Sequence, residues 1–419
     1  VCDYIPIIST FSNLADLFQK CVVLPLMNEP IGNRSYYTHL KNKHILRCIV
    51  LLIPLIGNLI VFINDFRKYQ GQNKDLILAA VKQNGMALRC ASVELRNDRD
   101  VVRAAAASQD GLALCYASVE LRNDRDVVRA AAASQDGLAL CYASEQLRGD
   151  RGVVLAAVRQ EGWALRYASE ELQGDRDVVL AAIGQEGLAL AFASEQLRGD
   201  RGVVLAAASQ NGWALKYASE ELQGDREVVL AAIRQEGLAL AFASEQLRGD
   251  RGVVLAAIRQ EGWAFGYASE ELQGDREVVL AAIGQNGLVL EYASAQMRGD
   301  RGVVLAAASQ NGRALAYASA QLRGDWEVVL EAILQNASAL RCASAQLQGD
   351  RNFILAAAQR NGLVLEHVSQ QLQGDWEVAL AAASHNGLAL RFVLEQLKDN
   401  EAFMRAVIQA NGSAFTSPS

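Results

Sequence analysis

The chain has 419 residues, of which 51% are apolar and 21% are charged, and its formal net charge at pH 7 is −7. This apolar content excludes a wholly disordered protein. The acidic balance disfavours a nucleic acid as partner, because binding to a phosphate backbone depends on Lys and Arg side chains that displace counterions. Length alone would suggest two or three globular domains, but internal repetition overrides that expectation.

Residues 44–66 are the most apolar part of the N-terminal region, residues 1–70. From Cys48 to Ile63 only a proline, a glycine and an asparagine interrupt the aliphatic run. A membrane-spanning helix needs about 20 apolar residues, and some tolerate Pro and Gly. Two hypotheses stay open: a membrane-associated helix that makes contact through Cys48–Ile63, or a buried hairpin that packs against Val22–Leu26 and caps the first repeat.

A repeat covers residues 73–412. An Asp that follows a turn glycine or asparagine recurs every 25 residues. Two early units, which start at Asp98 and Asp124, have 26 residues because of an extra alanine, and we expect this alanine to lengthen their first helix. The spacing predicts thirteen full units and a final half unit, followed by a short polar tail at residues 413–419 that we expect to fray.

The first helix of the unit is illustrated by residues 225–237. Asp225 is predicted to cap this helix by accepting hydrogen bonds from its free amides, and Glu227 complements the helix dipole. Val228–Ile233 is apolar on every face, as in a helix packed between two neighbours. We expect Gly237 to end the helix in the left-handed conformation.

A second helix is predicted from Leu238, with one buried stripe. The stripe consists of Ala239, Leu240, Ala243 and Leu247. Helices of about ten residues are too short to be stable alone in water, so stacking must stabilise them. The sequence therefore predicts an all-α protein, an α-solenoid of about thirteen two-helix repeats of 25 residues that curves into a superhelix, preceded by a hydrophobic helical N-terminal region. The L-x-x-L-x-L strand of a leucine-rich repeat, which has a similar length, does not occur.

A second period of 50 residues lies on top of the first. Tryptophan and leucine alternate at the position that begins the second helix, and the tryptophans are Trp163, Trp213 and Trp263. If exposed, they form a ladder of aromatic anchors of the kind enriched at protein interfaces; the alternative is that they pack between repeats. Trp326 and Trp376 lie beside the cap Asp instead, where we expect them to shield a helix terminus.

Two positions vary while the buried pattern is constant, and we expect them to be exposed. The ninth residue after each Asp varies as Arg159, Gly184, Ser209, Arg234, Arg259, Gly284 and Ser309. The sixteenth varies as Arg166, Ala191, Lys216, Ala241, Gly266, Glu291 and Ala316. The candidate protein-binding residues are therefore Trp163, Trp213, Trp263, Arg159, Arg166, Lys216, Arg234 and Arg259.

The unit D-R-E-V-V-L-A-A-I-x-Q-x-G-x-A-L-x-x-A-S-E-x-L resembles the repeat family known as domain of unknown function 4116, over residues 73–412. The resemblance implies an effector-like interaction protein, secreted by or exposed on a bacterium that lives inside amoebae or other eukaryotic cells; a cytoplasmic location is the alternative. It supplies no catalytic residues. The unit at Ala337 departs from the pattern because it lacks the turn glycine, so we expect its helix geometry to differ.

No catalytic or metal-binding pattern is found among the polar residues. The four histidines form no His-x-x-x-His motif, and the repeated Asp and Ser are architecture because each occurs in nearly every unit. Cys90 and Cys342 occupy a position that elsewhere holds Tyr or Phe, so we expect them to be buried. We therefore expect no enzyme activity, no cofactor and no metal.

Two classes of function remain. The first is a scaffold that presents a concave helical surface to an unidentified protein, of the host or of the bacterium. The second is a non-enzymatic structural spacer tethered to a membrane, with little specific binding. We favour the scaffold.

Overall fold

The computed structural model describes residues 73–108, 111–134 and 137–414. The chain divides into two compact units, residues 1–156 and 157–419, which are described separately. Throughout the described residues every regular element is a helix. The predicted hydrophobic segment at 44–66 and the rest of the N-terminal region lie outside the described residues. Among the helices that the structure describes, none is both long and apolar enough to cross a membrane.

Each repeat contains three helical elements rather than the predicted two. A long α-helix starts the repeat, a six-residue 3-10 helix follows, and a short helix of about one turn ends it. This triplet occurs thirteen times in the described part of the chain, and the final helix α29 (Glu401–Ala414) forms the half repeat. Helix α29 includes residues 413 and 414 of the predicted tail, and residues 415–419 lie outside the described part.

The long helices have eight or ten residues. In the first unit they are α5 (Lys74–Gln83), α7 (Arg99–Ala106) and α8 (Arg125–Ala132), and α10 (Arg151–Val158) spans the boundary. In the second unit they are α12 (Arg176–Gln185), α14 (Arg201–Gln210), α16 (Arg226–Gln235), α18 (Arg251–Gln260), α20 (Arg276–Gln285), α22 (Arg301–Gln310), α23 (Trp326–Gln335), α25 (Arg351–Arg360) and α27 (Trp376–His385).

The 3-10 helices follow the long helices directly. They are η4 (Gly85–Cys90), η5 (Gly111–Tyr116) and η7 (Gly137–Tyr142) in the first unit. In the second unit they are η8 (Gly162–Tyr167), η9 (Gly187–Phe192), η10 (Gly212–Tyr217), η11 (Gly237–Phe242), η12 (Gly262–Tyr267), η13 (Gly287–Tyr292), η14 (Gly312–Tyr317), η16 (Ala337–Cys342), η17 (Gly362–His367) and η18 (Gly387–Phe392).

The short helices complete the repeats. In the first unit they are α6 (Val93–Arg96), η6 (Leu121–Asn123) and α9 (Glu145–Arg148). In the second unit they are α11 (Glu170–Gln173), α13 (Glu195–Arg198), α15 (Glu220–Gln223), α17 (Glu245–Arg248), α19 (Glu270–Gln273), α21 (Ala295–Arg298), η15 (Leu322–Gly324), α24 (Ala345–Gly349), α26 (Gln370–Gln373) and α28 (Glu395–Lys398).

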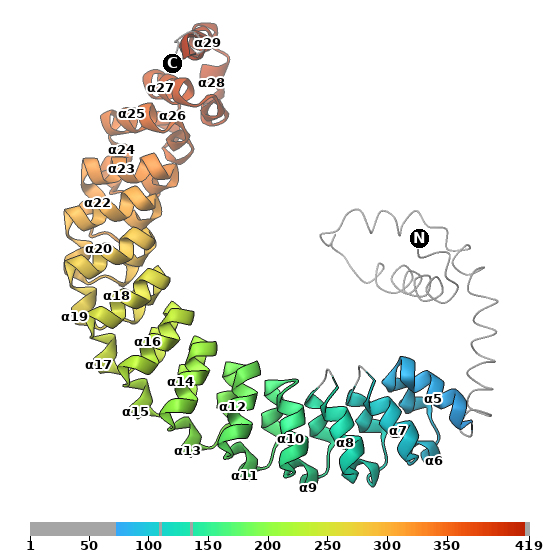
Figure 1. Ribbon diagram of the computed structural model, residues 1–419. Helices are drawn as coiled ribbons and strands as arrows, with labels where there is room; N and C mark the ends of the chain where they lie inside the picture. The colour runs from blue at the N-terminus through green and yellow to red at the C-terminus, as the bar shows by residue number, and fades with distance from the viewer. Residues whose placement is uncertain (1–72, 109–110, 135–136, 415–419) are drawn as a thin grey trace, which may run out of the picture. The chain divides into compact units, whose positions relative to one another are not determined.

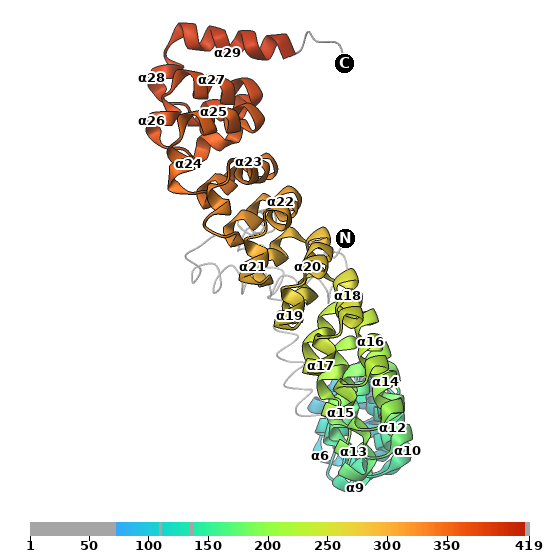
Figure 2. The ribbon, with the colours of Figure 1, turned by 90° about the vertical axis from the view of Figure 1, so that its left-hand side faces the viewer.

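Within residues 157–419, elements of the same kind stack on one another. Each long helix packs against the next long helix, and each 3-10 helix packs against the next 3-10 helix. Figure 1 shows α12, α14, α16 and α18 in sequence order, with α13, α15 and α17 along one side of them. Figure 2 shows the later long helices, with α29 as the last element. The core lies between the long helices and the 3-10 helices, where Val228, Val229 and Ala232 are fully buried.

The single second helix predicted from Leu238 is wrong, although its buried stripe is confirmed. The chain is extended at Ala243 and Ser244, which separates η11 from α17. The hydroxyl of Ser244 accepts a hydrogen bond from Leu247 N at 3.4 Å, and so caps a new helix instead of continuing the old one. The backbone amide of Ser244 donates to Gln223 O of the preceding repeat at 2.8 Å. The break therefore provides a backbone hydrogen bond between repeats.

The left-handed conformation predicted for Gly237 is also wrong, because no described residue has a positive φ. The helix ends at Gln235, and the next residue, Glu236, has an extended backbone. Glycine at 237 has a different role: a Cβ there would lie 2.8 Å from Ala257 O of the next repeat, closer than a real Cβ contact. The absent side chain allows close approach between repeats.

The extra alanine of the two 26-residue repeats does not lengthen the first helix. Helices α7 and α8 have eight residues, against ten in most other repeats, so the additional residue falls in the connection to the 3-10 helix. The hydroxyl of Ser108 donates to Ala105 O at 2.6 Å, and Ser134 bonds Ala131 O in the same way. These bonds lie at the last turn of each helix.

The repeat that lacks the turn glycine keeps the common geometry. Its 3-10 helix η16 begins at Ala337, and the side chain of Asn336 accepts from Ser338 N at 3.0 Å, as asparagine does at the same position in other repeats. In addition, Asn361 Nδ2 donates to Ile333 O at 2.8 Å across the joint to the next repeat. The expected change in helix geometry at Ala337 is therefore not observed.

Candidate interaction surface

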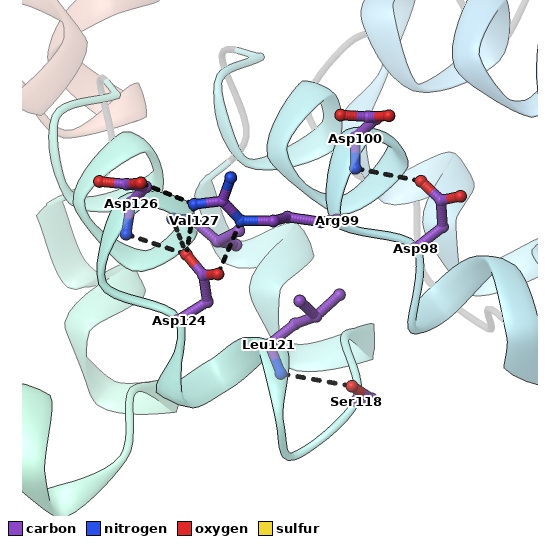
Figure 3. A network of polar contacts seen from close by, with 8 residues as sticks. All are labelled: Asp98, Arg99, Asp100, Ser118, Leu121, Asp124, Asp126 and Val127. Atoms are coloured by element: carbon purple, nitrogen blue, oxygen red, sulfur yellow. Dashed lines mark hydrogen bonds and ion pairs between the residues drawn. The ribbon is translucent and has the colours of Figure 1, made fainter.

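One Asp carboxylate joins two repeats at the start of most long helices. In Figure 3, Asp124 Oδ1 accepts from the backbone amides of Asp126 and Val127, each at 3.0 Å, as the predicted N-cap does. The other oxygen, Oδ2, lies 2.7 Å from Arg99 Nε of the preceding repeat. The same arginine pairs with Asp126 at 2.6 Å. The edge of the stack formed by the starts of the long helices thus holds the ion pairs that join repeats. It is called the ion-pair edge.

These contacts shift the ionisation of both partners. The hydrogen bond from Arg99 holds the pKa of Asp124 below its usual value, against the opposing effect of burial. The two carboxylates raise the pKa of Arg99 in return. In the second unit the pKa of Asp225 is lowered first by Arg201. The repeated Asp is therefore a charged structural group, and nothing in its surroundings prepares it to act as an acid or base.

The three tryptophans predicted as anchors occupy the second residue of η8, η10 and η12. Each ring packs edge-on against an aromatic ring of the next repeat, and each side chain remains more than a third exposed. The ring pairs are Trp163–Phe192 at 5.6 Å, Trp213–Phe242 at 5.5 Å and Trp263–Tyr292 at 6.0 Å between centroids. Both sequence alternatives, exposure and packing between repeats, thus describe part of what these tryptophans do.

A second aromatic position was missed by the sequence analysis as a surface feature. The last residue of each 3-10 helix is aromatic through most of the second unit, and Tyr267 and Tyr292 are 41% and 38% exposed. Because Tyr292 contacts Trp263, the two aromatic positions share one surface. The signal was present in the sequence, since this position holds Tyr or Phe in repeat after repeat.

The five charged candidate residues are all exposed. Arg166 Cζ lies 5.9 Å from the ring centroid of Tyr167, and Lys216 Nζ lies 5.8 Å from that of Tyr217, which is cation–π distance. Arg234 and Arg259 lie in the last turns of α16 and α18, and Arg159 directly follows α10. The structure therefore brings Arg166 and Lys216 into the aromatic surface, and it places the other three arginines at the helix ends that lead into it.

Trp326 and Trp376 lie on the opposite edge, at the first residue of α23 and α27, where other repeats carry the bridging arginine. Their rings pack edge-on against Phe353 at 5.0 Å and Phe403 at 5.3 Å, two side chains that are fully buried. At these two joints an aromatic ring pair takes the place of the ion pair between repeats. Both tryptophans lie at a helix terminus, as the sequence predicted.

The remaining candidates for chemistry have structural surroundings. His385 Nδ1 accepts from Gly362 N at 3.3 Å, and burial lowers the pKa of His367. Over the described ranges no group of three or more His, Cys, Asp or Glu side chains could hold a metal ion. Cys342 is half-buried, but Cys90 is exposed, so its predicted burial is wrong.

Comparison with known proteins places the repeats in one family. The model described as Domain of unknown function (DUF4116) matches the chain eight times, at residues 73–107, 105–148, 150–198, 200–248, 250–298, 300–348, 325–373 and 350–398. Six of these matches, from residue 150 to residue 398, each span two successive repeats. No curated protein and no solved structure matches the chain significantly. Because the matches cover most of its length, the chain belongs to the family of Domain of unknown function (DUF4116).

Proposed function

We propose that the chain is a protein-binding scaffold and that it binds its partner through an aromatic row on the 3-10 helices of residues 157–419. The aromatic row consists of Trp163, Trp213, Trp263, Tyr267 and Tyr292. The single observation that supports this proposal is the exposure of these five side chains, between 36% and 41% each, along one row of stacked elements. Exposed aromatic residues in a row are unusual on a protein without a partner and are typical of interface anchors.

Packing between repeats does not by itself require tryptophan at these positions. The intervening repeats carry Leu188, Leu238 and Leu288 at the same place, and their 3-10 helices stack in the same way. The larger ring adds exposed aromatic area beyond what stacking needs. This comparison within the chain supports a role for the tryptophans in binding.

Charged side chains next to the row fit a polar rim around an apolar centre. Arg166 and Lys216 lie within the row, and Arg159, Arg234 and Arg259 lie on the helices that lead into it. We include in the proposal that the chain acts without catalysis, and that its partner is a protein of a host cell or of the bacterium that makes it. The family resemblance supports a host cell or the bacterium as the source of the partner. The aromatic row supports a protein as the kind of partner.

The test replaces the three tryptophans of the full chain by leucine, the residue of the intervening repeats. The triple variant Trp163→Leu, Trp213→Leu and Trp263→Leu should keep its helical content and cooperative melting. We expect it to lose a protein that the parent captures from eukaryotic or bacterial lysate. Trp326→Arg is the matched control: it removes an exposed tryptophan from the opposite edge and introduces the residue found there in other repeats.

Two results would count against the proposal. A folded triple variant that captures the same protein as strongly as the parent would exclude the tryptophans as anchors. Loss of the partner in Trp326→Arg alone would move the binding surface to the opposite edge. If parent and variants all fold and capture nothing, the spacer hypothesis becomes the better account.

A further inference from the structure

Tyr167, Tyr217 and Tyr267 end three alternate 3-10 helices and have different neighbours. Arg166 lies over the ring of Tyr167, and Lys216 lies over the ring of Tyr217. The equivalent neighbour of Tyr267 is Gly266, which has no side chain and supplies no cation. Accordingly Tyr267 is 41% exposed, whereas Tyr167 and Tyr217 are half-buried. The chain thus covers two of these rings with its own cations and leaves the third open.

Gly266 lies against a second ring, that of Tyr292 in the next repeat. A Cβ built on Gly266 would be 3.2 Å from Tyr292 Cγ. Trp263 packs edge-on against the same Tyr292 ring, 6.0 Å between centroids. Tyr292 therefore contacts both Gly266 and Trp263, and the exposed Tyr267 follows Gly266 in the chain. The position of Gly266, together with Trp263, Tyr267 and Tyr292, is called the Gly266 gap.

Exposed carboxylates follow the Gly266 gap along the chain, whereas Arg259, in the last turn of α18, precedes it. Glu291, exposed, precedes Tyr292 and occupies the position that holds Arg166 and Lys216 in earlier repeats. Burial, together with the charge of Glu291 and a hydrogen bond with it, raises the pKa of Tyr317 in the next repeat. Exposed Glu270 and Glu271 follow Gly266 on α19. Aromatic faces beside carboxylates attract a cation and discourage an anion.

We propose that the Gly266 gap binds a Lys or Arg side chain of a basic segment in a partner protein, in the place that the chain's own Arg166 and Lys216 occupy in the other repeats. This inference rests on the proposed scaffold function and specifies the chemistry of its partner. The cation lies over Tyr267, between Trp263 and Tyr292, and Glu291 supplies the opposite charge.

The test uses the immobilised full chain and three degenerate peptide libraries with the same background. Two central positions are fixed as Lys or Arg in the first library, as Gln in the second and as Leu in the third. We expect the basic library to bind about tenfold more tightly than the other two, and its advantage to shrink as salt is added. Equal binding of the leucine library would mean an apolar site and would overturn the proposal.

Two substitutions at one residue separate charge from folding. Gly266→Lys gives this repeat the cation that Lys216 gives another, so it should fill the site and abolish the preference for the basic library. Gly266→Ala adds the same Cβ without a charge and should retain most of that preference. Ala191→Lys adds the same charge three repeats away and should leave binding unchanged. Unaltered binding by a folded Gly266→Lys variant would overturn the proposal.

Further outcomes distinguish this inference from the scaffold function. Binding of the leucine or glutamine library that is lost in the Trp→Leu triple variant would retain the scaffold and reject the cation site. No binding of any library by the parent would likewise reject the cation site, while the lysate capture decides on the scaffold independently. Self-association of the parent that Gly266→Lys abolishes, seen by light scattering, would identify a second copy as the occupant and would also overturn the proposal.

Discussion

The two kinds of joint between successive repeats of residues 157–419 differ in their ion pairs. Repeats that begin Asp-Arg-Gly, such as the one at Asp200, are called glycine repeats, and those with a carboxylate at the third position, such as the one at Asp225, are called acid repeats. At the glycine-to-acid joint, Arg201 pairs with both Asp225, 2.8 Å away, and Glu227. At the acid-to-glycine joint, Arg226 pairs with Asp250 alone, 3.7 Å away.

The aromatic contacts follow the same alternation. Trp213 of a glycine repeat packs against Phe242 of the following acid repeat, whereas Leu238 of the acid repeat takes the tryptophan's place at the next joint. Some acid-to-glycine joints use a glutamine instead: Gln210 Oε1 accepts from Gly187 N at 2.6 Å, and Gln210 Nε2 donates to Gln185 O at 3.2 Å.

This comparison shows that the backbone structure has a period of 25 residues, whereas the side-chain contacts between repeats have a period of 50 residues. The backbone triplet recurs in every repeat, but the side chains that join repeats recur in every second one. Six of the family matches, such as the one at residues 200–248, each span two repeats. In a stack held together by contacts between neighbours, alternation of joints should make stability alternate as well.

The largest expected effect comes from acid, because it acts on several capping carboxylates at once. The pKa values of Asp225 and Asp200 are lowered in the folded chain, the first mainly by Arg201 and the second mainly by Val203 N. Stability from a lowered carboxyl pKa is complete above the ordinary value of 3.8 and is lost as the pH falls below it, through the folded-state value. Circular dichroism should therefore show the array unfolding on acidification below that value.

The salt dependence of these two pKa values distinguishes the two kinds of joint. NMR titration should show that added salt raises the pKa of Asp225 more than that of Asp200, because salt screens a partly exposed arginine better than a backbone amide in contact. Equal salt effects on both residues would contradict the distinction between the joints.

The next largest effect is expected from adding a Cβ at a turn glycine. At Gly212 this Cβ would overlap Ala232 O of the next repeat, so Gly212→Ala should destabilise the array by about 1–3 kcal/mol. Gly237→Ala at the other kind of joint should cost less, because its Cβ would be 2.8 Å from Ala257 O. Denaturant unfolding measures both.

Gly184→Ala is the matched control, since nothing lies within 4 Å of a Cβ at that helical position. It should leave stability unchanged or raise it by about 0.5–1 kcal/mol, because alanine favours the helix and restricts the unfolded chain. If Gly184→Ala lowered stability as much as Gly212→Ala does, close approach between repeats would not be the reason for the effect at Gly212.

A smaller effect is expected when a glycine-to-acid joint loses its ring pair. Trp213→Leu removes the edge-on contact with Phe242 and should lower stability by about 1 kcal/mol. The variant places at this joint the leucine that acid-to-glycine joints carry naturally, so the fold should be retained. Thermal melting of parent and variant at equal concentration measures the difference. An unchanged melting temperature would mean that the tryptophans contribute to binding alone.

The smallest effect concerns the ion pairs themselves. Arg201→Ala removes contacts with two carboxylates and Arg226→Ala removes contact with one, so the first should lower the melting temperature more. High salt should abolish the difference, because these pairs are exposed. A larger loss in Arg226→Ala, or a difference that survives high salt, would contradict the ranking of the joints.

Local signals in the sequence predicted much of the fold. The Asp caps, the apolar first helix and the buried stripe from Ala239 to Leu247 follow from spacing and residue type, and the structure confirms them. The 3-10 helix and the role of Gly237 were not predictable in this way. Both depend on how closely the next repeat approaches, as at Ala257 O, and a single unit contains no information about that distance.

The candidate surface was predicted only in part for a related reason. Trp163, Trp213 and Trp263 attract attention because they alternate with leucine, whereas Tyr267 belongs to a series that is aromatic in most repeats and does not stand out in the sequence. Its exposure results from the glycine beside it, a contact that spacing alone does not reveal.

Site-specific photo-crosslinking tests the central claim, that the aromatic row binds a protein, most directly. Benzoyl-phenylalanine would replace Tyr267 in the aromatic row or Arg226 on the ion-pair edge of the full chain, and each variant would be illuminated in lysate after its folding is verified. The account predicts a crosslinked partner from position 267 and none from position 226. Crosslinking from 226 alone, or equally from both, would contradict it.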